Sequence, residues 1–211
     1  KFIGSEAEMD SSLIQLSMLI DRDEPVNVLD EVRSLYTRVY DRNSFAVIEH
    51  TFMLVSSLFR GEFPGYRKCT TQYHDFDHTL DAFLATARLL DGIAVAEAPV
   101  SVTHATRGLL AALFHDTGYI QLIDDSDGTG AKYTKEHVER SEEFVSRNAL
   151  AFGLSRADIE EIVLLISCTD MGTEIPSLNF SDRSMMLVGK VLGTADLLGQ
   201  MSDRAYLKKL L

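Results

Sequence analysis

Apolar residues recur along this chain mainly with the spacing of α-helices, and the strict alternation typical of β-strands does not recur. Between residues 28 and 39, for example, the apolar positions follow the i, i+3, i+4, i+7 spacing that places them on one helix face. Similar spacing predicts helices over 45–59, 75–90, 100–114, 133–152 and 156–168, and a last helix that begins near Ser181. The sequence therefore predicts an all-α fold.

Short segments rich in glycine, proline and aspartate separate the predicted helices. The breakers are Gly61 with Pro64-Gly65, Gly92 with Pro99, the run 124–130, Gly153, and Gly172 with Pro176. No internal repeat of 20–50 residues and no low-complexity linker divides the chain. We therefore predict a single domain over residues 1–211. Residues 70–200 form its core, and residues 1–60 form a helical N-terminal extension or part of the same bundle.

Composition and charge narrow the class of protein. With 211 residues, 45% hydrophobic and 25% charged, the chain is long enough to bury a large core without disulfides. Its net charge of −12 repels polyanions and argues against nucleic-acid binding. Cys69 and Cys168 are far apart and are expected to be free thiols in a reducing compartment, which predicts a cytoplasmic location. The apolar run 13–20 is too short to span a bilayer and lacks the basic flank of a signal peptide, so no membrane association is expected.

A histidine and an aspartate, His115-Asp116, stand at the end of the apolar run 108–114. Successive residues on a helix diverge by about 100°, so these two converge on one ion most easily where a helix ends. The following Thr117-Gly118 is typical of such an end. The pair is therefore a candidate for binding a divalent cation.

Two further segments carry side chains that could bind the same cation as His115 and Asp116. His74 and His78 are four residues apart, which places them on roughly the same side of a helix that starts near Asp75. Asp196 lies among small and apolar residues, where a carboxylate is costly to bury unless it is paired or metal-bound. Two imidazoles and two carboxylates without a thiolate suit a hard or borderline ion: Mg²⁺, Mn²⁺, Fe²⁺, Ni²⁺ or Zn²⁺.

The order His78, His115-Asp116, Asp196 resembles the HD-domain superfamily of metal-dependent phosphohydrolases, an all-helical fold in which these four side chains bind the metal. The likeness spans about residues 70 to 200. Its details resemble the cyclic-nucleotide phosphodiesterase branch in the strings Tyr73-His74-x-x-x-His78-x-x-Asp81, His115-Asp116, Thr169-Asp170-Met171 and Ala195-Asp196-Leu197.

The resemblance implies roles for individual residues. His74 would protonate the leaving oxygen, and Asp116 would bridge to a second ion or orient the attacking water. Thr169 would hydrogen-bond a metal-bound water, and Asp81 would orient a histidine. On the helix that follows, Glu136 and His137 are a looser counterpart of residues that serve a second ion in that branch. The resemblance thus implies one or two divalent ions and a small, nucleotide-like phosphorylated substrate.

Some positions depart from the phosphodiesterase pattern. Tyr119 stands where that branch has a histidine. The chain also stops 15 residues after Asp196, before the place of the purine-recognising glutamine. Cyclic-nucleotide specificity is therefore not expected to carry over, and the general bacterial HD hydrolase pattern fits at least as well.

Other interpretations compete with this one. Taken alone, a His-Asp pair is more often a hydrogen-bonded helix end than a ligand pair, Asp81 an exposed helix residue and His137 a solvated one. The string His74-Asp-Phe-Asp-His78 resembles the zinc-peptidase motif with Asp in place of Glu, but that interpretation leaves His115-Asp116 and Asp196 unexplained. A regulatory HD domain that binds metal and nucleotide without turnover is the main alternative to an enzyme. A homo-oligomer is compatible with both the enzyme and the regulatory domain.

Overall fold

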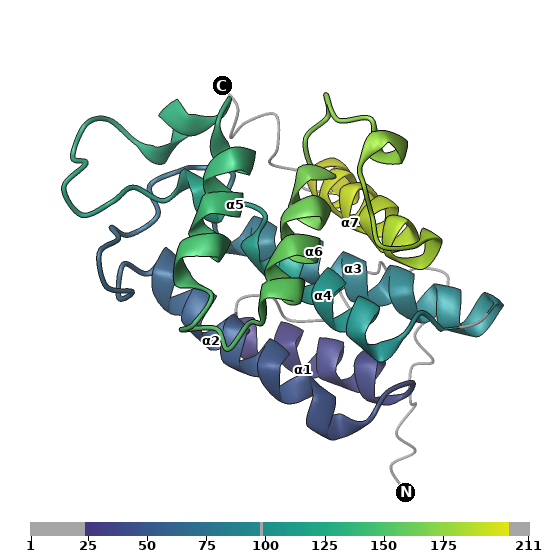
Figure 1. The fold of residues 1–211 in the computed structure, drawn as a ribbon. Coiled ribbons are helices and arrows are strands. Elements are labelled where there is room, and N and C mark those ends of the chain that lie inside the picture. Colours follow the sequence, from purple (N-terminus) through teal and green to yellow (C-terminus); the bar gives the residue numbers. More distant parts are fainter. Residues whose placement is uncertain (1–23, 98, 203–211) are drawn as a thin grey trace, which may run out of the picture.

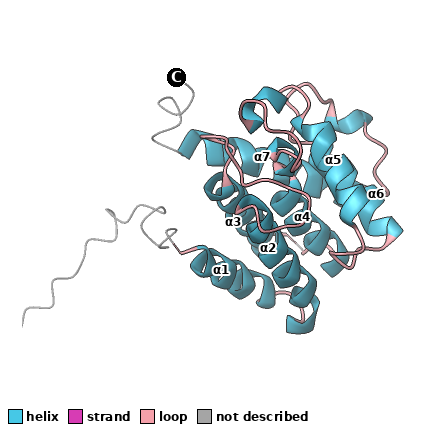
Figure 2. Ribbon diagram, turned by 90° about the vertical axis from the view of Figure 1, so that its left-hand side faces the viewer, coloured by secondary structure: helices cyan, strands magenta, loops and turns pink. Residues whose placement is uncertain are grey.

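The computed structural model describes residues 24–97 and 99–202, and its regular elements there are helices (Figure 1). Seven α-helices are described: α1 (Pro25–Thr37), α2 (Ala46–Phe59), α3 (Phe76–Ala96), α4 (Val102–Phe114), α5 (His137–Asn148), α6 (Arg156–Ser167) and α7 (Arg183–Ser202). Four short 3₁₀ helices join them: η3 (Arg42–Phe45), η4 (Thr117–Tyr119), η5 (Gly130–Tyr133) and η6 (Ile175–Ser177). Within the described ranges there is no strand, only one isolated bridge between Tyr66 and Leu122 (Figure 2). The predicted all-α fold is confirmed.

Helices α3 and α4 lie at the centre of the bundle. The helix α3 packs against α1, α4 and α7, and α4 also contacts α2, α6 and α7, while α5 packs beside α6 (Figure 1). Val28 and Val32 of α1 belong to the same buried cluster as Phe83 of α3 and Leu109 of α4. Residues 25–59 thus contribute to the same core as the central helices.

Three helix boundaries differ clearly from the predicted ones, and one of them is the end of α5, at Asn148 instead of Phe152. Gly92 was expected to end α3, but the helix continues to Ala96. A glycine inside a helix costs only about 1 kcal/mol, and the neighbourhood of Gly92 is open, so packing elsewhere on α3 outweighs this cost. The α5 helix begins at His137 instead of at Tyr133, because Gly130–Tyr133 forms η5. At Gly130 the backbone lies against the Tyr119 carbonyl oxygen, which would be 2.1 Å from an added Cβ.

Side-chain caps fix the starts of the helices that carry the candidate residues. The Asp75 carboxylate accepts from the His78 backbone N–H at 3.0 Å, which caps the first turn of α3. The Ser101 hydroxyl accepts from the His104 N–H and caps α4. The α4 helix ends at Phe114 with His115 as its C-cap, so the predicted helix end at the His-Asp pair is confirmed.

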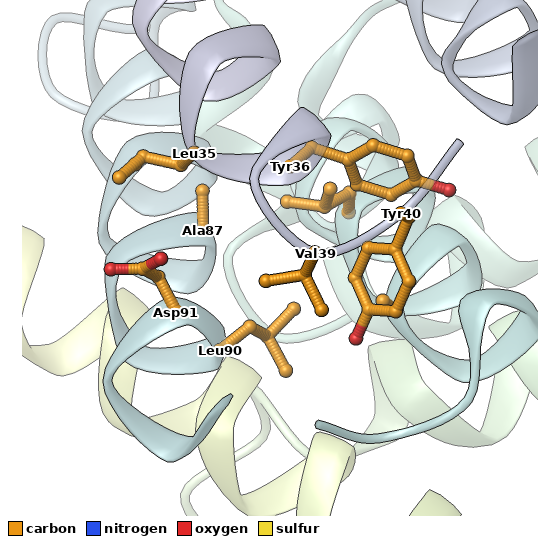
Figure 3. A pocket seen from close by; sticks show the side chains of 9 residues that line it. Leu35, Tyr36, Val39, Tyr40, Ala87, Leu90 and Asp91 are labelled. Atoms are coloured by element: carbon orange, nitrogen blue, oxygen red, sulfur yellow. The ribbon is translucent and has the colours of Figure 1, made fainter. Parts of the chain in front are cut away.

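A small, partly open pocket lies between α1, α3 and α4 (Figure 3). The rings of Tyr36 and Tyr40 lie on one side of it, and residues of α3 lie on the other. The Tyr40 hydroxyl donates to the Val100 carbonyl at 2.8 Å, and Asp91 forms an ion pair with Arg38 at 2.6 Å. With these polar groups already paired, the pocket offers mainly apolar surface. Its lining residues are Leu35, Tyr36, Val39, Tyr40, Ala87, Leu90, Asp91, Ala105 and Leu109.

None of the described helices combines the length and apolar character that crossing a membrane requires. The apolar run 13–20, which the sequence analysis judged too short to span a bilayer, lies outside the described residues.

We predict that Leu109→Ala lowers the free energy of unfolding by about 2–5 kcal/mol. Leu109 is 1% exposed and lines the pocket, so truncating it adds a cavity beside an existing void. Chemical denaturation measures the change. Leu150→Ala is the control, because Leu150 is 96% exposed and its truncation should alter stability by less than about 0.5 kcal/mol. Equal effects of the two substitutions would contradict this description of the core.

Candidate metal centre

Five side chains from four segments meet at one end of the central helices, and we call them the His-Asp cluster. They are His74, His78, His115, Asp116 and Asp196. His78 belongs to the first turn of α3, His115 and Asp116 follow α4, Asp196 lies on α7, and His74 precedes α3. The contacts of α3 with α4 and α7 bring these segments together. Four of the five are buried, and the side chain of His74 remains 22% exposed.

One group of ligand atoms comes from α3, the end of α4, and α7. His78 Nε2 lies 3.0 Å from Asp196 Oδ1 and 3.4 Å from His115 Nε2, and His115 Nε2 lies 3.7 Å from Asp196 Oδ1. All three atoms fall within 4.8 Å of one another, which is close enough for one ion to bind them together.

A second group shares His78 and is built around Asp116. Asp116 Oδ2 lies 2.9 Å from His74 Nδ1, 3.5 Å from His78 Nε2 and 3.4 Å from His115 Nε2. His74, His78 and Asp116 again place their ligand atoms within 4.8 Å of one another. The two groups together contain the four residues that the sequence predicts as ligands, and His74 in addition.

The ring nitrogens of His115 are oriented for metal binding. Its Nδ1–H donates to the Ala112 carbonyl at 2.9 Å, and a carbonyl oxygen can only accept. In the neutral ring the lone pair is therefore on Nε2, which faces His78, Asp116 and Asp196. A backbone partner of this kind fixes the tautomer of metal-bound histidines, so this observation supports a fit between the cluster and a divalent ion.

His137 lies at the edge of the cluster, at the first position of α5. Its Nδ1–H donates to the Thr134 carbonyl at 2.8 Å, and its Nε2 lies 3.9 Å from Asp116 Oδ1. Burial lowers the pKa of His137, so its neutral form is favoured. A neutral imidazole that faces a carboxylate is a suitable ligand for a cation.

The turn that carries His115 and Asp116 is held by α5. The buried Ser141 hydroxyl donates to the His115 carbonyl at 2.6 Å and accepts from the Gly118 N–H at 2.8 Å. Arg140 donates to the Gly118 carbonyl at 2.7 Å. A Cβ on Gly118 would lie 2.0 Å from the His137 carbonyl oxygen, so a side chain there would force α5 away from the turn. Sequence reasoning did not identify Ser141, because its hydrogen bonds reach backbone atoms more than 20 residues away.

Burial and neighbouring charges shift the pKa values of His115 and Asp116 in opposite directions. Burial alone would lower the pKa of His115, but the carboxylates of Asp116 and Asp196 outweigh it and raise the pKa above its ordinary value of 6.5. Burial alone would raise the pKa of Asp116, but His115 and the hydrogen bond from His74 hold that pKa well below its usual range. The folded, metal-free protein thus favours a protonated imidazole beside an ionised carboxylate.

The remaining candidates lie farther from the ligand atoms. The Thr169 hydroxyl donates to the Ile166 carbonyl at 2.8 Å, and Glu136 is an exposed N-cap of α5 whose side chain makes no cap hydrogen bond. Asp81 follows His78 by one helical turn, and both lie near Gly199 of α7. The Tyr73 hydroxyl hydrogen-bonds His78 Nδ1 at 3.2 Å, a contact that the sequence analysis did not foresee. Neither Thr169 nor Glu136 is brought into contact with the ligand atoms.

No family model, curated protein or solved structure matches this chain. What the structure itself establishes is a buried group of histidines and aspartates that is able to hold a metal ion.

We predict that His115→Ala and Asp116→Ala each remove most of the bound divalent metal. Both residues belong to a shared set of ligand atoms, so losing either one leaves the other ligands with too few partners for tight binding. Metal analysis and calorimetric titration with Mn²⁺ and Zn²⁺ measure the loss. His50→Ala is the control, since His50 is exposed and contacts the Ala151 carbonyl. Full metal content in either cluster variant would refute the assignment.

We also predict that added Zn²⁺ raises the melting temperature more at about pH 8 than at about pH 6. The pKa of His115 is raised in the folded protein, so its protonated form contributes stability below pH 6.5 that is lost as pH rises through the folded pKa. An ion has to displace this proton, and it does so more easily at high pH. Thermal unfolding with and without Zn²⁺ measures the difference.

In His115→Gln the Zn²⁺ shift should be small at both pH values, whereas His50→Gln should behave like the wild type. A shift that does not change with pH would contradict the competition between proton and ion.

Proposed function

We propose that this protein is a metal-dependent phosphohydrolase with an HD-type centre. The observation that carries the proposal is the position of His74 beside the candidate ligands. Its Nδ1 is held by Asp116 Oδ2 at 2.9 Å, its side chain is 22% exposed, and its Nε2 forms no hydrogen bond within the described residues. The centre therefore combines a set of ligand atoms with a proton carrier that a substrate is able to reach.

In this proposal His78, His115, Asp116 and Asp196 hold the ion. When bound, the ion, one of Mg²⁺, Mn²⁺, Fe²⁺, Ni²⁺ or Zn²⁺, would activate a water and neutralise charge on the phosphoryl oxygens. His137 Nε2 lies 3.9 Å from Asp116 Oδ1, so His137 would be available to a second ion. These donors are imidazoles and carboxylates, which suit all of the ions named.

The role of His74 follows from its two nitrogens. Asp116 accepts the Nδ1–H, which fixes the ring and leaves Nε2 to carry the transferable proton. As a water oxygen forms the new bond to phosphorus and the bond to the leaving oxygen breaks, the Nε2 proton of His74 would pass to that leaving oxygen. Asp116 thus serves as both metal ligand and positioning group for the acid.

The substrate class rests on the same centre. A protein with a net charge of −12 attracts a phosphate ester only through a local positive charge. The ion held by His78, His115, Asp116 and Asp196 would supply that charge. A small phosphorylated molecule such as a nucleotide fits this requirement, whereas a long polyanion would be repelled by the rest of the surface.

A substrate screen tests the proposal. Purified protein with measured metal content is incubated with bis(p-nitrophenyl) phosphate, cyclic nucleotides, nucleoside monophosphates and nucleoside triphosphates, each with the five candidate ions. Release of phosphate or alcohol from at least one substrate, dependent on the ion, is the expected result. Metal-loaded protein that binds a nucleotide and cleaves none of these compounds would favour a regulatory domain without turnover.

We predict that His74→Asn keeps the bound metal but lowers kcat by about 10²–10⁴-fold, the range expected when a general acid is lost. Asparagine retains a hydrogen bond to Asp116 but carries no transferable proton. Steady-state kinetics and metal analysis on the same sample measure the two effects. His104→Asn is the control, because His104 pairs with Asp182 at 3.4 Å, outside the cluster. Undiminished turnover in His74→Asn would exclude the assigned role.

A further inference from the structure

Tyr119 has no assigned role in the mechanism above, yet its ring contacts both partly exposed imidazoles. Its centroid lies 4.3 Å from that of His74 with an interplanar angle of 14°, and 4.6 Å from that of His137 with an angle of 22°. Both contacts are stacked. Tyr119 itself is 1% exposed, so the protein fixes its ring.

The two imidazoles lie on the same face of Tyr119. Their centroids are 5.9 Å apart. Rings stacked on opposite faces would be separated by two contact distances of about 3.5 Å, or at least about 7 Å. The Tyr119 ring is therefore a flat support on which His74 and His137 lie side by side.

The direction in which the Nε2 atoms of His74 and His137 point depends on what holds each ring. The terminal torsion of a histidine ring is broad, so one hydrogen bond at Nδ1 leaves the plane of the ring free to tilt. His74 is held at Nδ1 by Asp116, and His137 is held at Nδ1 by the Thr134 carbonyl. Stacking on Tyr119 supplies the second constraint for each ring.

The hydroxyl of Tyr119 does not take part in these contacts. It is buried and forms no hydrogen bond with His74 or His137. The contacts that hold the imidazoles are made by the face of the ring, which phenylalanine also provides.

We propose that Tyr119 is a positioning residue that aligns His74 for proton donation and His137 toward Asp116. The part concerning His74 rests on the phosphohydrolase function proposed above. Tyr119 stands where the phosphodiesterase pattern has a histidine, and in this chain it orients two other histidines instead.

The test compares Tyr119→Phe, which keeps the ring, with Tyr119→Leu and Tyr119→Met, which remove it. All three variants should keep the ion held by His78, His115, Asp116 and Asp196, because Tyr119 forms no hydrogen bond with any of these four residues. We expect Tyr119→Phe to keep kcat within about twofold, and the two aliphatic variants to lose about 10- to 100-fold in kcat with little change in KM. Tyr36→Leu is the matched control, since Tyr36 is also a buried tyrosine and its ring contacts Tyr40 and Phe45, away from the cluster.

A second measurement does not depend on activity. Imidazole ¹⁵N spectra of the metal-free protein should show protected Nδ1–H signals for His74 and His137 in the wild type, Tyr119→Phe and Tyr36→Leu. These signals should broaden or disappear in Tyr119→Leu and Tyr119→Met. Thermal unfolding identifies any variant that has lost its fold. If one of Tyr119→Leu and Tyr119→Met fails to fold, the other one is compared with Tyr119→Phe.

The outcomes separate this inference from the proposed function. If Tyr119→Leu and Tyr119→Met keep both kcat and the protected signals, Tyr119 does not position the imidazoles. If Tyr119→Phe loses as much activity as the aliphatic variants, the hydroxyl acts and the inference fails. If the wild type cleaves no phosphate substrate, the phosphohydrolase proposal fails, and the spectra still decide whether Tyr119 orients the two rings.

Discussion

The buried carboxylate of Asp116 is the constraint on which the rest of the site depends. It is 1% exposed, and a charge at such depth is costly unless partners compensate for the lost water. Four imidazoles approach it, from His74 at 2.9 Å to His137 at 3.9 Å. The protein thus stabilises one negative charge with several groups that are able to carry a proton or to share a metal ion. Whatever occupies the site has to satisfy Asp116.

Close packing of the helices brings the residues of the cluster to Asp116. Asp196 reaches the cluster because α7 lies very close to its neighbours. A Cβ at Gly108 of α4 would lie 2.6 Å from the Val188 side chain, and one at Gly193 would lie 2.6 Å from the Cys168 carbonyl oxygen. Larger residues at these positions would push α7 outward and carry the Asp196 carboxylate away from His78. The small residues before Asp196 therefore set the geometry of the site as well as the packing of the core.

Periodicity predicted the seven described α-helices, because each buries an apolar face and so keeps the 3.6-residue spacing that the sequence shows. It erred at Gly92, where packing of α3 outweighs a local preference, and at Tyr133, where a close backbone approach produces η5. The residues of the His-Asp cluster could be singled out from the sequence, because histidines and aspartates within or beside apolar runs are conspicuous there. The contacts that hold the cluster in place could not be predicted from the sequence. Ser141 lies more than 20 residues from its backbone partners, and the contact of Tyr73 with His78 depends on how the chain bends before α3. Neither contact follows from the local sequence.

The position of His137 also could not be inferred from its local sequence. Its acidic surroundings in the sequence favour a solvated position, but its side chain is only 19% exposed. Its Nε2 faces Asp116, because α5 is tied to the His115-Asp116 turn through Ser141. The resulting site has two levels. The ligand atoms of His78 and His115 are enclosed, where a low dielectric strengthens their interaction with an ion. The imidazoles of His74 and His137 lie nearer the solvent on the face of Tyr119. In the function proposed above, these two partly exposed imidazoles are the part of the site that a substrate would contact, while the enclosed ligand atoms would hold the ion.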